Sequence, residues 1–333
     1  MKFDATYAEL NEHLNRIHQL GTIGKLLSWD EQVNLPEDSA DQRAAQHSVL
    51  AETAHTAEMD PRLGEILTGL EADLALLTDE QQVVVKEARR DYDIATKLPA
   101  EFVREKAKQS SVGYHAWAKA RAESDFASYV PVLEKNLELA QREAAYLGWG
   151  DRAYDYMIDL HDPGMSAAVI SELFGELKKE LVPLVKQITA SSVKPRTDIL
   201  RGFPCEAQSS FLHEVTEKLG FNYRRGRIDV SLHPFCSGTG SDIRMTTRFH
   251  EDEPLDSLFS SIHETGHGLY EQGLPAEHHA NALGRAAGMG VHESQSRLWE
   301  NQVARSREFW RYFEPRFRQT FPEQTKSVSS DEL

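Results

Sequence analysis

Apolar side chains recur every three or four residues along most of the chain, which is the spacing of one face of an α-helix. The pattern predicts a first helix over residues 5–29, ended by Pro36. The same spacing predicts further helices at 39–58, after Asp60-Pro61, from Thr78 to about Thr96, from Pro99, over 125–147, after Ser166, and around Phe211–Leu219. Tyr154-Asp155-Tyr156 and His161-Asp162-Pro163-Gly164 predict a loop. The fold class is therefore mainly α.

Residues 222–249 show a different pattern. Apolar and polar residues alternate in 227–231 and again in 243–249, with the glycine-rich stretch 237–241 between them. Alternation on both sides of a turn predicts a small antiparallel sheet. We expect two regions of one continuous catalytic domain: a helical region at 1–221, and a segment at 222–333 that holds this sheet and metal-binding helices over 255–311.

The strongest candidate for chemistry is His263-Glu264-Thr265-Gly266-His267, directly after the predicted sheet. Residues four apart share one face of a helix, so both imidazoles can point at one divalent ion. Glu264 lies roughly 100° around the helix from His263. Its carboxylate is then placed to act on water beside the metal, which is the general-base position of a metalloprotease.

A hydrolytic zinc site needs a third protein ligand and an open position. The His-x-x-Gly-x-x-His extension of the motif is absent, whereas Glu293 follows after the turn at 273–275 and can return on a neighbouring helix. The alternative is a chance pattern on a surface helix. Apolar residues such as Leu258 and Ile262 instead predict a buried helix, in which a charged cluster is costly unless a metal is bound.

Composition limits the partners and the compartment. The 333-residue chain has a net charge of −16, which argues against nucleic acid or an anionic membrane as a partner. It has only two cysteines, no apolar signal core at the N-terminus and no run as long as a membrane span. We therefore expect a cytoplasmic protein.

Several short motifs, taken in order, resemble the M32 family of metallocarboxypeptidases, the carboxypeptidase Taq type. They are His263-Glu264-Thr265-Gly266-His267, His292-Glu293-Ser294-Gln295, His233-Pro234-Phe235, Asp242-Ile243-Arg244-Met245-Thr246, and the N-terminal Ser28-Trp29-Asp30-Glu31-Gln32 with Leu35-Pro36 and Arg43-Ala44-Ala45-Gln46. The resemblance covers the whole chain and is far more specific than any one motif.

The resemblance implies a multi-helix gluzincin-type metallopeptidase whose small sheet lines the active-site cleft. It implies a homodimer that removes single residues from peptides with a free C-terminus. His263, His267 and Glu293 would bind Zn²⁺, with Co²⁺ or Mn²⁺ also compatible, and Glu264 would be catalytic. An endopeptidase or aminopeptidase with the same metal site, or an inactive metal-binding protein, are the alternatives.

Two further residues are candidates for substrate binding. Arg244 can contact a substrate carboxylate through two hydrogen bonds, or instead form a structural pair with Asp242. His233 can donate a hydrogen bond to substrate or to a developing oxyanion, or serve only as a core histidine.

The chain departs from the family in length. Family members continue further and carry Ile-Arg-x-x-Ala-Asp and Gly-x-x-Gln-Asp-x-His-Trp motifs, neither of which occurs here. We therefore expect a chain that lacks the C-terminal third, which leaves the activity of this polypeptide open.

Overall fold

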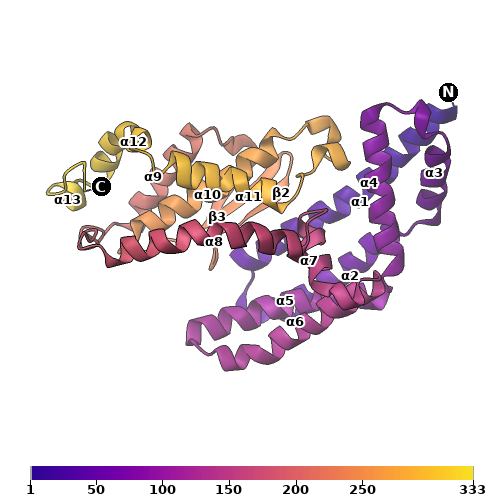
Figure 1. Ribbon diagram of the computed structural model, residues 1–333, viewed down its shortest axis with the longest axis horizontal. Coiled ribbons are helices and arrows are strands. Elements are labelled where there is room, and N and C mark those ends of the chain that lie inside the picture. The colour runs from indigo at the N-terminus through magenta and orange to yellow at the C-terminus, as the bar shows by residue number, and fades with distance from the viewer. Residues whose placement is uncertain (1, 333) are drawn as a thin grey trace. The chain divides into compact units, whose positions relative to one another are not determined.

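The computed structural model describes residues 2–332 and is mainly helical, as predicted (Figure 1). Its helices are α1 (Lys2–Val33), α2 (Ala40–Glu58), α3 (Pro61–Ala72), α4 (Asp79–Lys97), α5 (Ala100–Glu123), α6 (Phe126–Tyr146), α7 (Ala153–His161), α8 (Ala167–Ala190), α9 (Cys205–Lys218), α10 (Pro254–Gly273), α11 (Met289–Arg297), α12 (Arg307–Thr320) and α13 (Pro322–Thr325). The strands are β1 (Gly226–Val230), β2 (Cys236–Thr239) and β3 (Asp242–Thr247).

Local sequence signals explain where many helices begin. Thr78 and Gln81 form a reciprocal capping box at the start of α4, satisfying two backbone N–H groups that have no partner inside the helix. At the start of α3, the Asp60 side chain accepts a hydrogen bond from the Arg62 backbone N–H, and Pro61 occupies the first turn. Ser166 accepts a hydrogen bond from the Val169 backbone at the start of α8.

Of the loop predicted at residues 154–156 and 161–164, the first part is wrong, whereas residues 162–164 do lie outside the helices. The first part lies in α7, and the Tyr156 side chain is buried. A helix of nine residues is too short to show a clear periodicity, and the aromatic and acidic residues read as a turn. Burial of Tyr156, a tertiary effect, favours the helix.

The three strands form one sheet in the order β1-β3-β2. The sheet is mixed rather than wholly antiparallel as predicted. The reason is connectivity: β2 and β3 are joined by a short turn, whereas β1 is the direct neighbour of β3 although β2 comes between them in the sequence. Gly238 in the turn region has φ 111°, and a Cβ there would collide with the Asp242 carbonyl oxygen, so glycine is required.

The chain divides into two compact units. Unit 1 comprises residues 1–153, 237–244 and 270–286, and unit 2 comprises 154–236, 245–269 and 287–333. In unit 1, α1, α3 and α4 share a core that includes Leu10, Leu67 and Val85. The predicted division at residue 222 remains a prediction.

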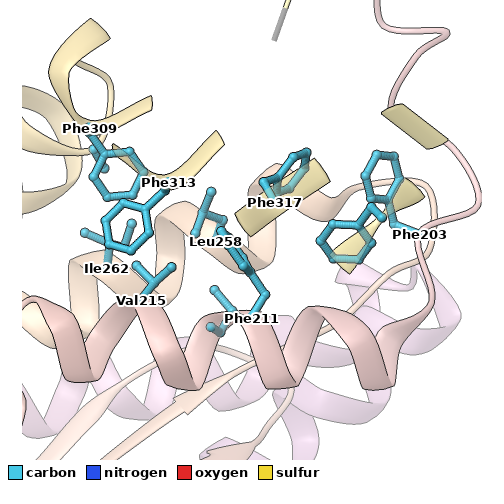
Figure 2. Close-up of a cluster of buried hydrophobic side chains, with 11 residues drawn as sticks. Phe203, Phe211, Val215, Leu258, Ile262, Phe309, Phe313 and Phe317 are labelled. Atoms are coloured by element: carbon cyan, nitrogen blue, oxygen red, sulfur yellow. The ribbon is translucent and has the colours of Figure 1, made fainter. Parts of the chain in front are cut away.

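Unit 2 has its own core, which is rich in phenylalanine. Figure 2 shows Phe211 and Val215 of α9, Leu258 and Ile262 of α10, and Phe309, Phe313 and Phe317 of α12 gathered with Phe203. Phe309, Phe313 and Phe317 recur every four residues, so they lie along one face of α12. This packing fixes one face of α10, and the same helix carries the candidate metal ligands.

Candidate metal centre

The two histidines of the motif lie on α10, as predicted, and the acid lies on α11. The His263 Nε2 and His267 Nε2 atoms lie 3.6 Å and 3.3 Å from Glu293 Oε2. One donor atom from each residue lies within 4.8 Å of the other two. All three side chains are half-buried and belong to unit 2.

Glycine allows the two helices to approach this closely (Figure 1). A Cβ on Gly266 would lie 2.5 Å from Ser296 Cα and 2.7 Å from the Gln295 carbonyl oxygen. Neither backbone atom can move aside as a flexible side chain can. Residue 266 must therefore be glycine if Glu293 is to reach the histidines.

The donor set fits a tetrahedral divalent ion. Ligand atoms bound at about 2.0–2.2 Å in tetrahedral geometry are separated from one another by about 3.3–3.6 Å. The two distances to Glu293 Oε2 fall in this range. Two imidazoles and one carboxylate leave a fourth position for water or substrate, which is the arrangement of hydrolytic sites.

His263 is oriented by a carboxylate that the sequence did not reveal. Its Nδ1 lies 2.9 Å from Glu300 Oε2, and Glu300 also accepts hydrogen bonds from Arg297 and Arg305 at 3.0 Å each. Burial raises the pKa of Glu300, but the bonds from His263 and Arg305 and the charge of Arg297 lower it overall. An ionised Glu300 keeps the proton of His263 on Nδ1, so the Nε2 lone pair faces the other donors.

His267 is held in a comparable way by another histidine. Its Nδ1 shares a hydrogen bond with His292 Nδ1, and the two ring centroids are 4.6 Å apart. Burial, together with His292 and His263, lowers the pKa of His267 to about 4. The ring is therefore neutral at pH 7, which is the state that a metal ligand requires.

Glu264 is the buried acid of the group, with only 6% of its surface exposed. Burial, followed by the negative charges of Glu293 and Glu300, raises the pKa of Glu264 to about 8. A carboxyl group with a pKa near neutrality can both accept and return a proton at working pH. A bound dication would lower this pKa, since positive charge favours the carboxylate.

The two predicted substrate-binding residues lie outside this cluster. Arg244, in unit 1, pairs with Asp242 through two hydrogen bonds of 2.9 Å and 3.1 Å and lies 4.1 Å from the centre of the Trp29 ring. His233, in unit 2, is exposed, and its Nδ1 lies 2.6 Å from the Pro234 carbonyl oxygen. Their roles in binding substrate stay predictions.

Sequence reasoning missed Glu300, Arg305 and the contact of His292 with His267. Glu300 is seven residues past Glu293, two helical turns along the same face, and that spacing was the available signal. The π-helical turn Leu298–Val303 carries Glu300, and π-turns are frequent at functional sites. The contact between the two histidines joins different helices and leaves no mark in the spacing.

In this mainly helical fold, two histidines and a glutamate converge on one point, which is a donor set that can hold a metal ion. The sequence profile of the Carboxypeptidase Taq (M32) metallopeptidase family matches residues 9–333. The chain belongs to this family, and its membership implies a metal cofactor. The predicted resemblance is confirmed.

Individual relatives agree. The chain is 38% identical to "Thermostable carboxypeptidase 1" of Thermus thermophilus over 332 residues, covering 96% of this chain and 65% of the relative. It is 32% identical to "Carboxypeptidase 1" of Bacillus subtilis over 327 residues, covering 98% and 65%. The chain thus spans about 65% of the length of these curated relatives.

Solved structures show the same fold. The crystal structure titled "BsuCP Crystal Structure" superposes with a TM-score of 0.94 at 32% identity, and the M32 carboxypeptidase from Deinococcus radiodurans R1 with 0.87 at 42%. Each comparison covers 98% of this chain and 66% of the other. Within residues 2–332, no helix combines the length and the apolar character needed to cross a bilayer.

Proposed function

We propose that this chain carries the metal centre of a carboxypeptidase that releases single residues from peptides with a free C-terminus. The observation that supports this most directly is the convergence of His263, His267 and Glu293, with the buried Glu264 beside them. The relatives are named carboxypeptidases, which favours this reaction over other peptide hydrolysis. The ion is Zn²⁺, with Co²⁺ or Mn²⁺ as substitutes that suit the same donors.

His263, His267 and Glu293 would hold the ion, which would supply Lewis acidity to the scissile carbonyl and to the attacking water. Glu264 takes the proton from the attacking water and gives it to the amine that leaves. Its buried position keeps the carboxylate away from bulk solvent, so the proton transfers take place within the site. Glu300 and His292 keep the Nδ1 sides of the two histidines engaged, which maintains the direction of their Nε2 atoms.

Substrate selection involves residues outside the cluster. Arg244 supports binding of the substrate carboxylate, although its pair with Asp242 uses two of its donor groups. His233, exposed in unit 2, donates a hydrogen bond to the substrate. The sheet lines the cleft, and the chain acts in the cytoplasm as a homodimer.

The test separates the metal site from the chemistry. Glu264→Gln preserves size and hydrogen bonding but cannot act as a base, so metal content measured by elemental analysis stays near one ion per chain while hydrolysis is lost. His267→Ala should lose both the bound metal and hydrolysis. Near-normal hydrolysis by the Glu264→Gln variant contradicts the assignment.

A second assay distinguishes the type of peptidase. A peptide with a free C-terminus and its C-terminally amidated copy are incubated with the chain, with and without a chelator. Release of one residue from the free peptide alone, abolished by the chelator, supports the proposal. Cleavage of both peptides at internal bonds would indicate an endopeptidase.

A further inference from the structure

A cavity in unit 1 gathers positive side chains although the chain as a whole is acidic. It has a volume of about 330 Å³ and lies between α1, the turn from β2 to β3 and the segment that follows α10. The lining residues that can carry charge are His18, Lys25, Asp242, Arg244 and His279, and all of them belong to unit 1. In a chain with a net charge of −16, a concave site that is positively charged attracts small anions.

The permanent charges that line the cavity do not cancel. Lys25 and Arg244 are positive, and Asp242 is the only acid among these described lining residues. Asp30 acts on Arg244 from nearby, but it lies outside the lining and is paired with Arg43 at 2.5 Å. One positive charge on the wall is therefore left unbalanced.

The pKa of His18 shows that the positive groups lie close to one another. Burial is the largest cause that lowers this pKa, and the charge of Lys25 is the next. His279 and Arg285 lower it further, so three basic groups oppose protonation of the same ring. An anion in the cavity would offset this repulsion.

Both cations keep hydrogen-bond donors that a ligand can use. Lys25 Nζ lies 3.2 Å from the Gly238 carbonyl oxygen, which occupies one of its three N–H groups. Arg244 binds Asp242 through Nε and Nη2, so its Nη1 group remains for another acceptor. Further donors on the wall are the hydroxyl groups of Ser237, Thr239 and Ser241.

The wall is held in place by contacts of its own. The bond from Lys25 to Gly238 joins α1 to β2. Gly240 packs against His279 so closely that a Cβ on Gly240 would lie 2.5 Å from the ring Nδ1. The Arg244 guanidinium lies 4.1 Å from the centre of the Trp29 ring, which fixes its direction. A preformed wall loses less conformational entropy when a ligand binds.

The size and charge of the cavity indicate the class of ligand. Its volume is that of a pocket for a small molecule, which leaves room for an organic body beside a charged group. Ile23 and Leu26, which are 47% and 41% exposed, supply an apolar part of the wall. One unbalanced positive charge matches one carboxylate, whereas a phosphate dianion would leave negative charge in excess.

We propose that this cavity binds a small organic carboxylate. The carboxylate oxygens accept hydrogen bonds from Lys25 and Arg244, which are charge-assisted and therefore strong. The apolar part of the ligand lies against Ile23 and Leu26. The site is separate from the metal ligands, since His263, His267 and Glu293 do not line it.

The test compares a charged ligand with its neutral copy. Butyrate and butyramide are titrated into the full chain by isothermal titration calorimetry, before and after the protein is loaded with metal. Butyrate should bind at least about tenfold more tightly than butyramide, because hydrogen bonds to charged groups are the stronger ones. The difference should be present in both forms of the protein, so a failure of the proposed peptidase function would leave it unchanged.

Variants locate the binding site. Lys25→Gln removes a positive charge from the wall and should weaken butyrate binding by about tenfold or more. Lys25→Arg keeps the charge and should retain most of the affinity. Lys119→Gln makes the same charge change at an exposed position of α5 outside the lining, and it should leave the affinity unchanged. Circular dichroism checks that each variant is folded.

Four results would overturn the proposal. Two of them are equal binding of butyrate and butyramide, and equal affinity for butyrate in the Lys25→Gln and Lys119→Gln proteins. Binding that appears only after metal loading would assign the carboxylate to the metal centre instead. Propyl phosphate that binds more than about tenfold more tightly than butyrate would show that the cavity suits a dianion.

Discussion

Gly266 offers the sharpest test of how the metal centre is assembled. Gly266→Ala places a Cβ 2.5 Å from Ser296 Cα, whereas carbon atoms pack without repulsion at about 3.5–4.0 Å. Helix α11 must therefore move away from α10 by about 1 Å. The donor distances between Glu293 and the two histidines, now 3.3 Å and 3.6 Å, would grow beyond what one tetrahedral ion spans.

The expected loss is large because the error falls on the ligands themselves. Changes that only loosen ligand orientation cost about 10–100-fold in metal affinity, so the variant should lose at least about 100-fold. Overpacking of the contact should also lower stability by about 1–3 kcal/mol. Metal affinity is measured by competition with a chromophoric chelator, and stability by urea unfolding of the metal-free protein.

A matched control is available in α3. A Cβ on Gly69 meets nothing within 4 Å, so Gly69→Ala should keep metal affinity and slightly raise stability, by about 0.5–1 kcal/mol. The reasoning fails if Gly266→Ala binds metal as tightly as the Gly69→Ala protein.

Three other changes test separate parts of the structure. Glu300→Gln removes the charged partner of His263 Nδ1 and should weaken metal binding about 10–100-fold in the chelator competition; unchanged affinity would contradict the orienting role. Burial raises the pKa of Tyr223 to about 12, so the unfolded chain loses this proton near pH 10 first and stability should fall as pH rises from about 10 to 12. Phenylalanine has no proton to lose, so Tyr223→Phe should lose less stability between pH 9 and 11 than the unsubstituted protein does. The difference in free energy of unfolding should be below about 1.4 kcal/mol, because the ring is only half-buried. Equal losses in the two proteins would refute this. Thr78→Ala removes the capping bond of α4 and should cost about 1 kcal/mol in urea unfolding, whereas Thr78→Ser should be nearly neutral.

The sequence determined the features that depend on short-range geometry. The caps of α3, α4 and α8 lie where polar residues precede apolar periodicity, since the capping bonds span only two or three residues. His263 and His267 share a face because four residues make about one helical turn. Glu293 could be named because a hydrolytic site needs a third ligand and few acids follow at a suitable distance.

Only the tertiary structure decided which distant groups complete the centre. Glu300 reaches His263 through a π-helical turn, and His292 reaches His267 across two helices. The seven-residue spacing from Glu293 places Glu300 on the same face, but whether either contact forms depends on how closely the segment that begins with α11 approaches α10. Tertiary contacts likewise made α7 a helix and placed β3 between β1 and β2 in the sheet. Periodicity predicted the helix at α8 but not the exposure of its apolar side chains. An apolar stripe shows which face a helix can bury, and only the tertiary structure shows whether that face is covered.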